Sequence, residues 1–161
     1  MVSDIGVSVA DQFQMIGIVI VAAALGAVLG TERELASKSA GVRTHMLLAG
    51  ASALAVSVGQ VLFVADGGTG DPARALHAVL TGIGFLGAGA IIRHQDTTVE
   101  GLTTAASLWF AAAVGAATGF GLVVLAAGAT AVGIFVLRSV SWMSVRIRGK
   151  APVEAPDDGA G

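Results

Sequence analysis

Long apolar stretches separated by short polar ones dominate this chain. Four segments contain no Asp, Glu, Lys or Arg, namely residues 12–31, 46–65, 75–92 and 101–137. Each of the first three is close to the ~20 residues with which a helix crosses about 30 Å of hydrocarbon. The fourth would be roughly 55 Å long as a single helix, which exceeds what a bilayer accommodates. We therefore expect the fourth segment to form two helices.

The turn between those two helices is expected at Gly119-Phe120-Gly121. Two glycines within three residues permit backbone angles that a helix cannot use. The pattern thus predicts an all-α integral membrane protein with five transmembrane helices in a compact bundle, the fourth and fifth forming a tight hairpin. The N-terminus carries Asp4 and Asp11 and no basic residue, so we expect the first apolar run to be a membrane helix rather than a signal peptide.

Composition agrees with a membrane protein, since 55% of the residues are hydrophobic and 12% are charged. The lipid bilayer is therefore the first expected partner. A net charge of −2 and the lack of a basic aromatic surface argue against nucleic-acid binding. The chain has no cysteine, so it has no disulfide framework, thiolate metal site or cysteine nucleophile.

Basic residues favour the cytoplasmic side of short membrane loops and predict an orientation. An external N-terminus and a cytoplasmic C-terminus place all the basic residues except Arg74 inside. We expect a transmembrane domain over residues 1–137, a basic juxtamembrane segment over 138–150 and a disordered tail over 151–161. An amphipathic regulatory helix is the alternative for 138–150.

The third apolar stretch contains Gly82-x-Gly84-x-x-Gly87, a spacing that can bind a dinucleotide pyrophosphate. A dinucleotide fold also needs alternating strands and helices, which the long Ala/Gly/Leu/Val runs do not provide. The favoured interpretation is helix packing, because small residues let transmembrane backbones approach closely. Small residues lie on two nearly opposite faces of this helix, so we expect it to be the centre of the bundle. This leaves no basis for an enzyme or a bound cofactor.

Similar spacings of small residues occur on the first, fourth and fifth helices. They show packing and leave open whether it occurs within one chain or between copies in a homo-oligomer. The predicted helix-packing glycines are Gly26, Gly30, Gly82, Gly84, Gly87, Gly89, Gly115 and Gly119.

Charged residues collect at the predicted cytoplasmic ends of the helices. One hypothesis is a polar network in which Arg33, Arg43 and Arg93 pair with Glu32 or Glu34 around a recognition surface. The alternative is a solvated loop with arginines facing lipid headgroups. The hydroxyls of Thr103, Thr104 and Ser107 are expected to bond to backbone carbonyls or across to the third helix. No span has an acid or base at its centre, which weighs against a proton-driven pump.

Four ordered blocks resemble the MgtC/SapB family of bacterial inner-membrane proteins and cover essentially the whole membrane region. They are GAVLGTERE (26–34), AGVRTHMLLAGASAL (40–54), TGIGFLGAGAIIR (81–93) and VEGLTTAASLWFAAAVGAATGFG (99–121). The resemblance implies an accessory protein that supports magnesium homeostasis, growth at low magnesium or virulence by acting on other membrane proteins. The alternative is a transporter or channel for magnesium or another small solute, with the third helix lining its path.

The prominent polar positions of the family correspond to Glu32, Arg33, Arg43, Thr44, Arg93, Thr103 and Thr104, and Glu34 completes the expected network. The resemblance assigns no metal ligand and implies only an indirect link to magnesium. The chain departs from the family pattern at Ala78 and Glu100. It is also expected to be a short form without the C-terminal soluble domain of longer members.

Overall fold

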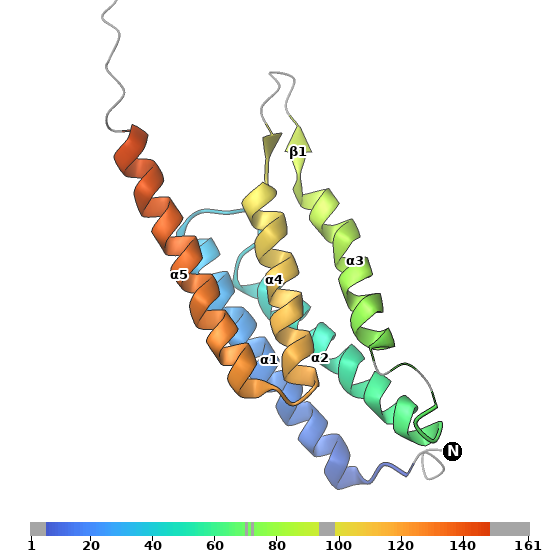
Figure 1. The fold of residues 1–161 in the computed structure, drawn as a ribbon. Helices are drawn as coiled ribbons and strands as arrows, with labels where there is room; N and C mark the ends of the chain where they lie inside the picture. Colours follow the sequence, from blue (N-terminus) through green and yellow to red (C-terminus); the bar gives the residue numbers. More distant parts are fainter. Residues whose placement is uncertain (1–5, 70, 72, 94–98, 149–161) are drawn as a thin grey trace, which may run out of the picture.

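Five helices form, as the apolar pattern predicts (Figure 1). The computed structural model describes residues 6–69, 71, 73–93 and 99–148. The helices are α1 (Val9–Leu35), α2 (Val42–Ala65), α3 (Arg74–Ala90), α4 (Leu102–Gly119) and α5 (Val123–Arg148). Successive helices run in opposite directions along the bundle, so their ends gather at two opposite ends of the molecule.

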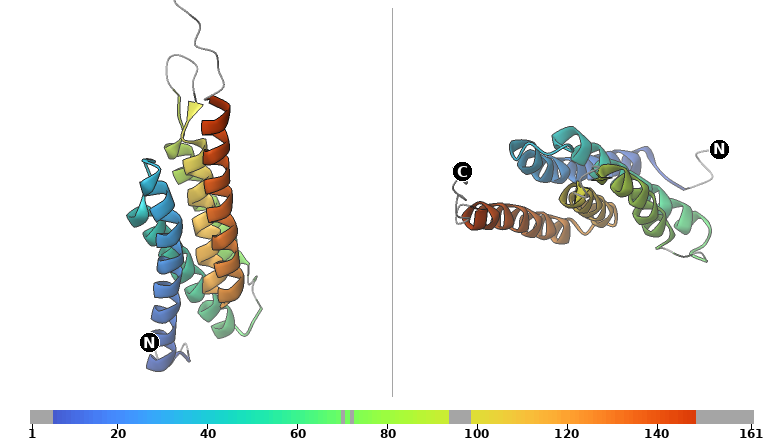
Figure 2. Two further views of the ribbon diagram at one scale, coloured as in Figure 1. Left: turned by 90° about the vertical axis from the view of Figure 1, so that its left-hand side faces the viewer. Right: turned by 90° about the horizontal axis from the view of Figure 1, so that it is seen from above.

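The helices form two layers, which are clearest when the bundle is seen end-on (Figure 2). One layer holds α1 and α2, and the other holds α5, α4 and α3 in that order. The central helix is α4, which contacts the other four helices. Its buried residues are mostly small, including Ala111, Ala112 and Gly115, so neighbouring backbones can approach it from several sides.

The bundle has small residues inside and large apolar residues outside. Most residues of the buried apolar core are alanines, whereas Phe13, Phe85, Val124 and Phe135 are at least two-thirds exposed. A surface of this kind is expected where lipid replaces water. Three helices in the described part of the chain, α1, α2 and α4, are long and apolar enough to span a membrane. The apolar part of α5 (Val123–Ser139) and α3 are both shorter, at 17 residues.

The predicted turn between the last two helices lies where the glycines indicate. Gly121 has φ +80°, a left-handed conformation that residues with a Cβ rarely adopt. The amides of Gly121 and Leu122 donate to the carbonyls of Thr118 and Ala117, which ends α4 in a Schellman motif. α5 then continues unbroken to Arg148, so position 137 lies within a helix. The predicted tail, 151–161, lies outside the described residues.

The predicted central position of the third helix is wrong, because α3 lies at one side of the bundle (Figure 1). Ile83 is its one buried residue in the described structure. A methyl group added at Gly82, Gly84 or Gly89 would have no atom of another element within 4 Å, whereas one added at Gly87 would contact Ala105 at 3.8 Å. Small residues permit close packing but do not require it, since lipid can cover an unoccupied helix face.

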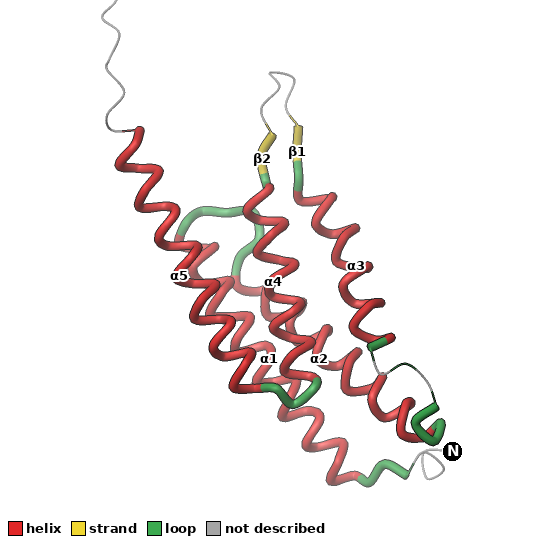
Figure 3. Tube along the Cα trace, viewed as in Figure 1, coloured by secondary structure: helices red, strands yellow, loops and turns green. Residues whose placement is uncertain are grey.

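Two short strands lie side by side between α3 and α4 (Figure 3). Strand β1 (Ile92–Arg93) pairs antiparallel with β2 (Val99–Glu100), with Ile92 opposite Glu100. After β2, Gly101 has φ +87°, and a Cβ there would collide with the Ala90 carbonyl oxygen. Glycine at this position therefore lets the end of α3 and the start of α4 meet.

Candidate functional site

Buried polar side chains gather where α1 ends and where α2 and α4 begin. We call this region the polar end of the bundle, and we define its buried polar cluster as Arg33, His45, Thr104 and Ser107. These side chains are between 0% and 5% exposed, although each is polar or charged. Withdrawing such groups from solvent is costly unless they are paired, so their partners reveal how the cluster is built.

Arg33 lies in the last turn of α1 with only 3% of its surface exposed. Its Nε donates to Oε2 of Glu32 at 2.6 Å, and the Glu32 side chain is itself 10% exposed. This pair neutralises the buried charge. The Nη1 atom of Arg33 is also buried and has no hydrogen-bond partner within the described residues. The guanidinium therefore keeps one unused donor inside the protein.

His45 is fully buried in the first turns of α2 and links that helix to α4. Its Nδ1 lies 2.9 Å from the Gly41 carbonyl oxygen, and its Nε2 lies 3.2 Å from Oγ of Ser107. A carbonyl can only accept, so Nδ1 carries a proton. The Ser107 hydroxyl also lies 2.8 Å from the Thr104 carbonyl, to which it donates. If the ring is neutral, Nε2 carries no proton and can only accept. The Ser107 hydroxyl proton is then shared between two acceptors, the Nε2 of His45 and the carbonyl oxygen of Thr104.

Glu34 links the end of α1 to the start of α2. Its Oε2 accepts a hydrogen bond of 2.9 Å from the amide of Val42, the first residue of α2. An acidic group at a helix N-terminus satisfies a free amide and interacts favourably with the helix dipole. A Cβ on Gly41 would lie 2.6 Å from the same carboxylate oxygen, so the small residue leaves room for this cap.

Beneath the polar end, α1, α2 and α4 touch through glycines. A Cβ on Gly26 or Gly115 would collide with the carbonyl oxygen of His45 or Ala49 respectively. A Cβ on Gly30 would lie 2.6 Å from the Cα of Val42, and a Cβ on Gly119 would lie 2.7 Å from the carbonyl oxygen of Ala53. We call these four glycines the glycine seam. The seam holds α2 in backbone contact with both α1 and α4, and this contact fixes the register in which His45 reaches Ser107.

The remaining predicted site residues occupy different surroundings. Arg43, Thr44 and Thr103 are exposed at the polar end. Within the described chain, Arg33 pairs with Glu32 as predicted, and no ion pair joins Arg43 to Glu32 or Glu34. Arg93 is placed in β1, but its side chain lies outside the described residues.

His45 was not singled out by the sequence analysis, although a signal for it exists. It lies four residues before Ala49 and eight before Ala53, and all three are buried on one face of α2. A polar residue that extends a small-residue stripe is therefore a candidate for an interhelical hydrogen bond. The described residues contain no group of three or more His, Cys, Asp or Glu side chains that could hold a metal ion.

An apolar exterior, a small-residue interior and a paired buried charge define this protein as a multi-pass α-helical membrane protein. Comparison with known sequences places it more narrowly. Residues 19–146 match the profile of the MgtC family, and the chain belongs to that family.

Three relatives illustrate the similarity. YhiD of Escherichia coli K12, whose name describes it provisionally as a magnesium transporter, is 37% identical over 84% of this chain and 64% of its own length. Protein MgtC of Brucella abortus is 42% identical over 66% of this chain and 42% of its own. Protein SapB of Bacillus subtilis is 34% identical over 82% of this chain and 57% of its own. The chain thus spans less than two-thirds of each relative. No solved structure matches it significantly.

Proposed function

We propose that this protein is an accessory protein of magnesium homeostasis that acts on another protein of the bacterial inner membrane. The name of the relative YhiD supports the link to magnesium. The glycine seam is the observation that favours an accessory role over transport. α2 is in backbone contact with both α1 and α4 directly beneath the buried polar cluster, and such close packing favours a solid bundle over a conducting path.

In this proposal the polar end faces the cytoplasm. The described basic residues other than Arg74 lie toward that end, on α1, α2, β1, α5 and the segment between α1 and α2. Such a distribution supports a cytoplasmic polar end and an external N-terminus. A reporter fused after residue 150 should be active only if it functions in the cytoplasm. Activity of a reporter that requires the periplasm would contradict this orientation.

The partner surface would consist of the exposed side chains that surround the buried cluster, including Lys38, Arg43 and Thr103. The decisive measurement is growth at limiting magnesium of a bacterium that lacks its own MgtC-family gene. The Lys38→Gln/Arg43→Gln double variant should lose most of the growth rescue while reaching the same level in the membrane. Arg74→Gln, at the opposite end of the bundle, is the matched control and should retain rescue.

Transport along the outer side of α4 is the second candidate function. It is favoured by the open faces of Gly82, Gly84 and Gly89 on α3 and by a crevice near the polar end lined by Thr44, Phe85 and Thr104. Vesicles reconstituted with the protein and loaded with a magnesium-sensitive dye separate the two proposals. The accessory role predicts the same flux as in empty vesicles. A saturable magnesium flux above that of empty vesicles would contradict the accessory role and support transport.

A further inference from the structure

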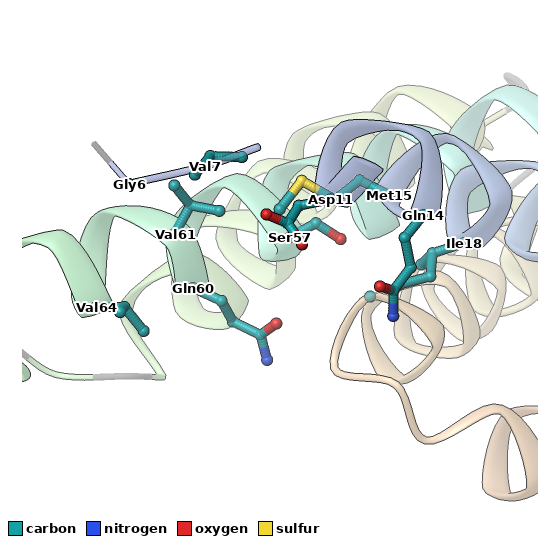
Figure 4. A pocket seen from close by; sticks show the side chains of 11 residues that line it. Gly6, Val7, Asp11, Gln14, Met15, Ile18, Ser57, Gln60, Val61 and Val64 are labelled. Carbon is teal, nitrogen blue, oxygen red and sulfur yellow. The ribbon is translucent and has the colours of Figure 1, made fainter. Parts of the chain in front are cut away.

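A separate pocket lies at the end of the bundle opposite the polar end. Figure 4 shows the side chains that line it. Its volume is about 320 Å³, and it lies between the first turns of α1 and the last turns of α2, with Gly119 of α4 at its edge. This volume is at the lower limit of the roughly 300–1,000 Å³ typical of small-molecule sites. The polar residues that line it are Asp11, Gln14, Ser57 and Gln60.

Ser57 shows that the pocket contains an unsatisfied polar group. Its side chain is 2% exposed, and its Oγ has no hydrogen-bond partner within the described residues. Other buried hydroxyls in this bundle behave differently, because Ser52 and Thr118 donate to the carbonyls four residues earlier in their own helices. A buried hydroxyl without a partner in a cavity wall is expected to bond to something that enters the cavity.

Asp11 gives the pocket its charge. Both hydrogen bonds from Ser8 to this carboxylate end on Oδ2, at 2.8 Å from the amide and 2.7 Å from the hydroxyl. The Ser8 hydroxyl oxygen also accepts from the Asp11 amide, which completes a capping box and fixes the carboxylate. No ion pair involves Asp11 in the described chain, and no basic residue lines the pocket. A cation is therefore the complementary ligand.

The rest of the lining favours an organic cation over a metal ion. Ile18, Val61 and Val64 give the pocket an apolar wall. Mg²⁺ keeps several waters and is usually held by one or two carboxylates together with other oxygens in octahedral array, and Asp11 is the only carboxylate among the described lining residues. An ammonium group needs only a few acceptors, and an apolar body attached to it can contact the aliphatic wall.

We propose that this pocket binds an organic ammonium group joined to a small apolar body. The ammonium would donate to Asp11, to the side-chain oxygens of Gln14 or Gln60, and to Oγ of Ser57. Two sources share this chemistry: a free amine, and the headgroup of an aminophospholipid whose chains lie along the bundle. The inference does not depend on the accessory role, because the pocket shares no residue with the buried polar cluster and only Gly119, at its edge, with the glycine seam.

Binding of 4-fluorophenethylammonium, followed by ¹⁹F NMR, tests the proposal on the full chain in nanodiscs of phosphatidylglycerol. Saturable binding is expected, and Asp11→Asn should weaken it by about tenfold or more because the charge-assisted bond is lost. Asparagine keeps an acceptor for the Ser8 amide, so α1 should still be capped. Asp66→Asn is the matched control, because it removes an exposed carboxylate at the same end of the bundle but outside the pocket.

The neutral analogue 4-fluorophenethyl alcohol provides a second control and should bind at least about tenfold more weakly. Ser57→Ala should weaken binding of the amine without lowering the stability of the ligand-free protein. Repeating the titration in phosphatidylethanolamine nanodiscs distinguishes the sources: competition by this lipid identifies the headgroup, and unchanged binding identifies a free amine. No saturable binding, equal binding of amine and alcohol, or equal effects of Asp11→Asn and Asp66→Asn would each overturn the proposal.

Discussion

Gly26→Ala tests whether α1 and α2 meet as closely as the structure indicates. The added methyl would lie 2.9 Å from the Cβ of Ala49 and still closer to the carbonyl oxygen of His45. Ordinary van der Waals contact begins near 3.4 Å, so relief of the contact with the His45 oxygen would need the two helices to separate by about 1 Å. The nearest obstacle is backbone, which cannot be relieved by a change of rotamer.

The expected magnitude combines two opposing effects. Inserting a methyl into a tightly packed interface costs about 1–3 kcal/mol. Replacing glycine by alanine within a helix returns about 1 kcal/mol of helix propensity. Gly17→Ala isolates the second effect, because Gly17 also lies within α1 but has no atom within 4 Å of the added Cβ. The free energies of unfolding of these two variants should therefore differ by about 1–3 kcal/mol, with Gly26→Ala the less stable.

Unfolding in mixed micelles of a mild detergent and increasing SDS, followed by tryptophan fluorescence, measures this difference. Trp109 on α4 is 46% exposed and reports separation of the bundle. Equal stabilities for Gly26→Ala and Gly17→Ala would refute the close approach of α1 and α2.

Other substitutions probe individual parts of the fold. Ser107→Ala should destabilise the protein by about 1–3 kcal/mol, because it leaves the buried Nε2 of His45 without a partner. Ser52→Ala loses only a bond within its own helix and should be nearly neutral, so similar losses of stability for both variants would contradict the His45–Ser107 link. Ser37 has φ +54° in the Schellman motif that ends α1, a conformation that glycine adopts more easily than serine. Ser37→Gly should therefore raise the free energy of unfolding by about 1 kcal/mol. A loss of stability in the same unfolding assay would contradict that geometry. Glu34→Gln should cost about 0.3–1 kcal/mol at low ionic strength and less at high salt; a salt-independent effect would exclude a charge interaction with the start of α2.

Much of the fold could be predicted from local sequence features. Gaps between charged residues locate the helices because a charge within hydrocarbon is costly wherever it lies along the chain. The glycine pair around Phe120 locates the last turn because left-handed backbone angles depend on the residue at that position. Both signals are independent of which helices become neighbours.

The arrangement of the helices could not be predicted in the same way. Small-residue stripes occur on α1, α3 and α4, but such a stripe does not specify which helix packs against it. The structure uses the stripes of α1 and α4 and leaves most of the glycines of α3 open. His45 and its pairing with Ser107 escaped prediction for a related reason, because the two residues are 62 positions apart and their pairing depends on the packing of α2 against α4.

The glycine seam and the buried polar cluster depend on each other. Lipid tails are as apolar as the helix surfaces, so burial of apolar area contributes little to helix association within a bilayer. Close contact at Gly26 and Gly115 brings α2 against α1 and α4, and only then can His45 span the gap to Ser107. The hydrogen bond in turn disfavours sliding of α2 along α4, because a shifted helix would leave a buried ring nitrogen unpaired. A frame held in this way sets where α2 and α4 begin, and under the proposed function the exposed Arg43 and Thr103 of these first turns would belong to the surface that a partner protein contacts.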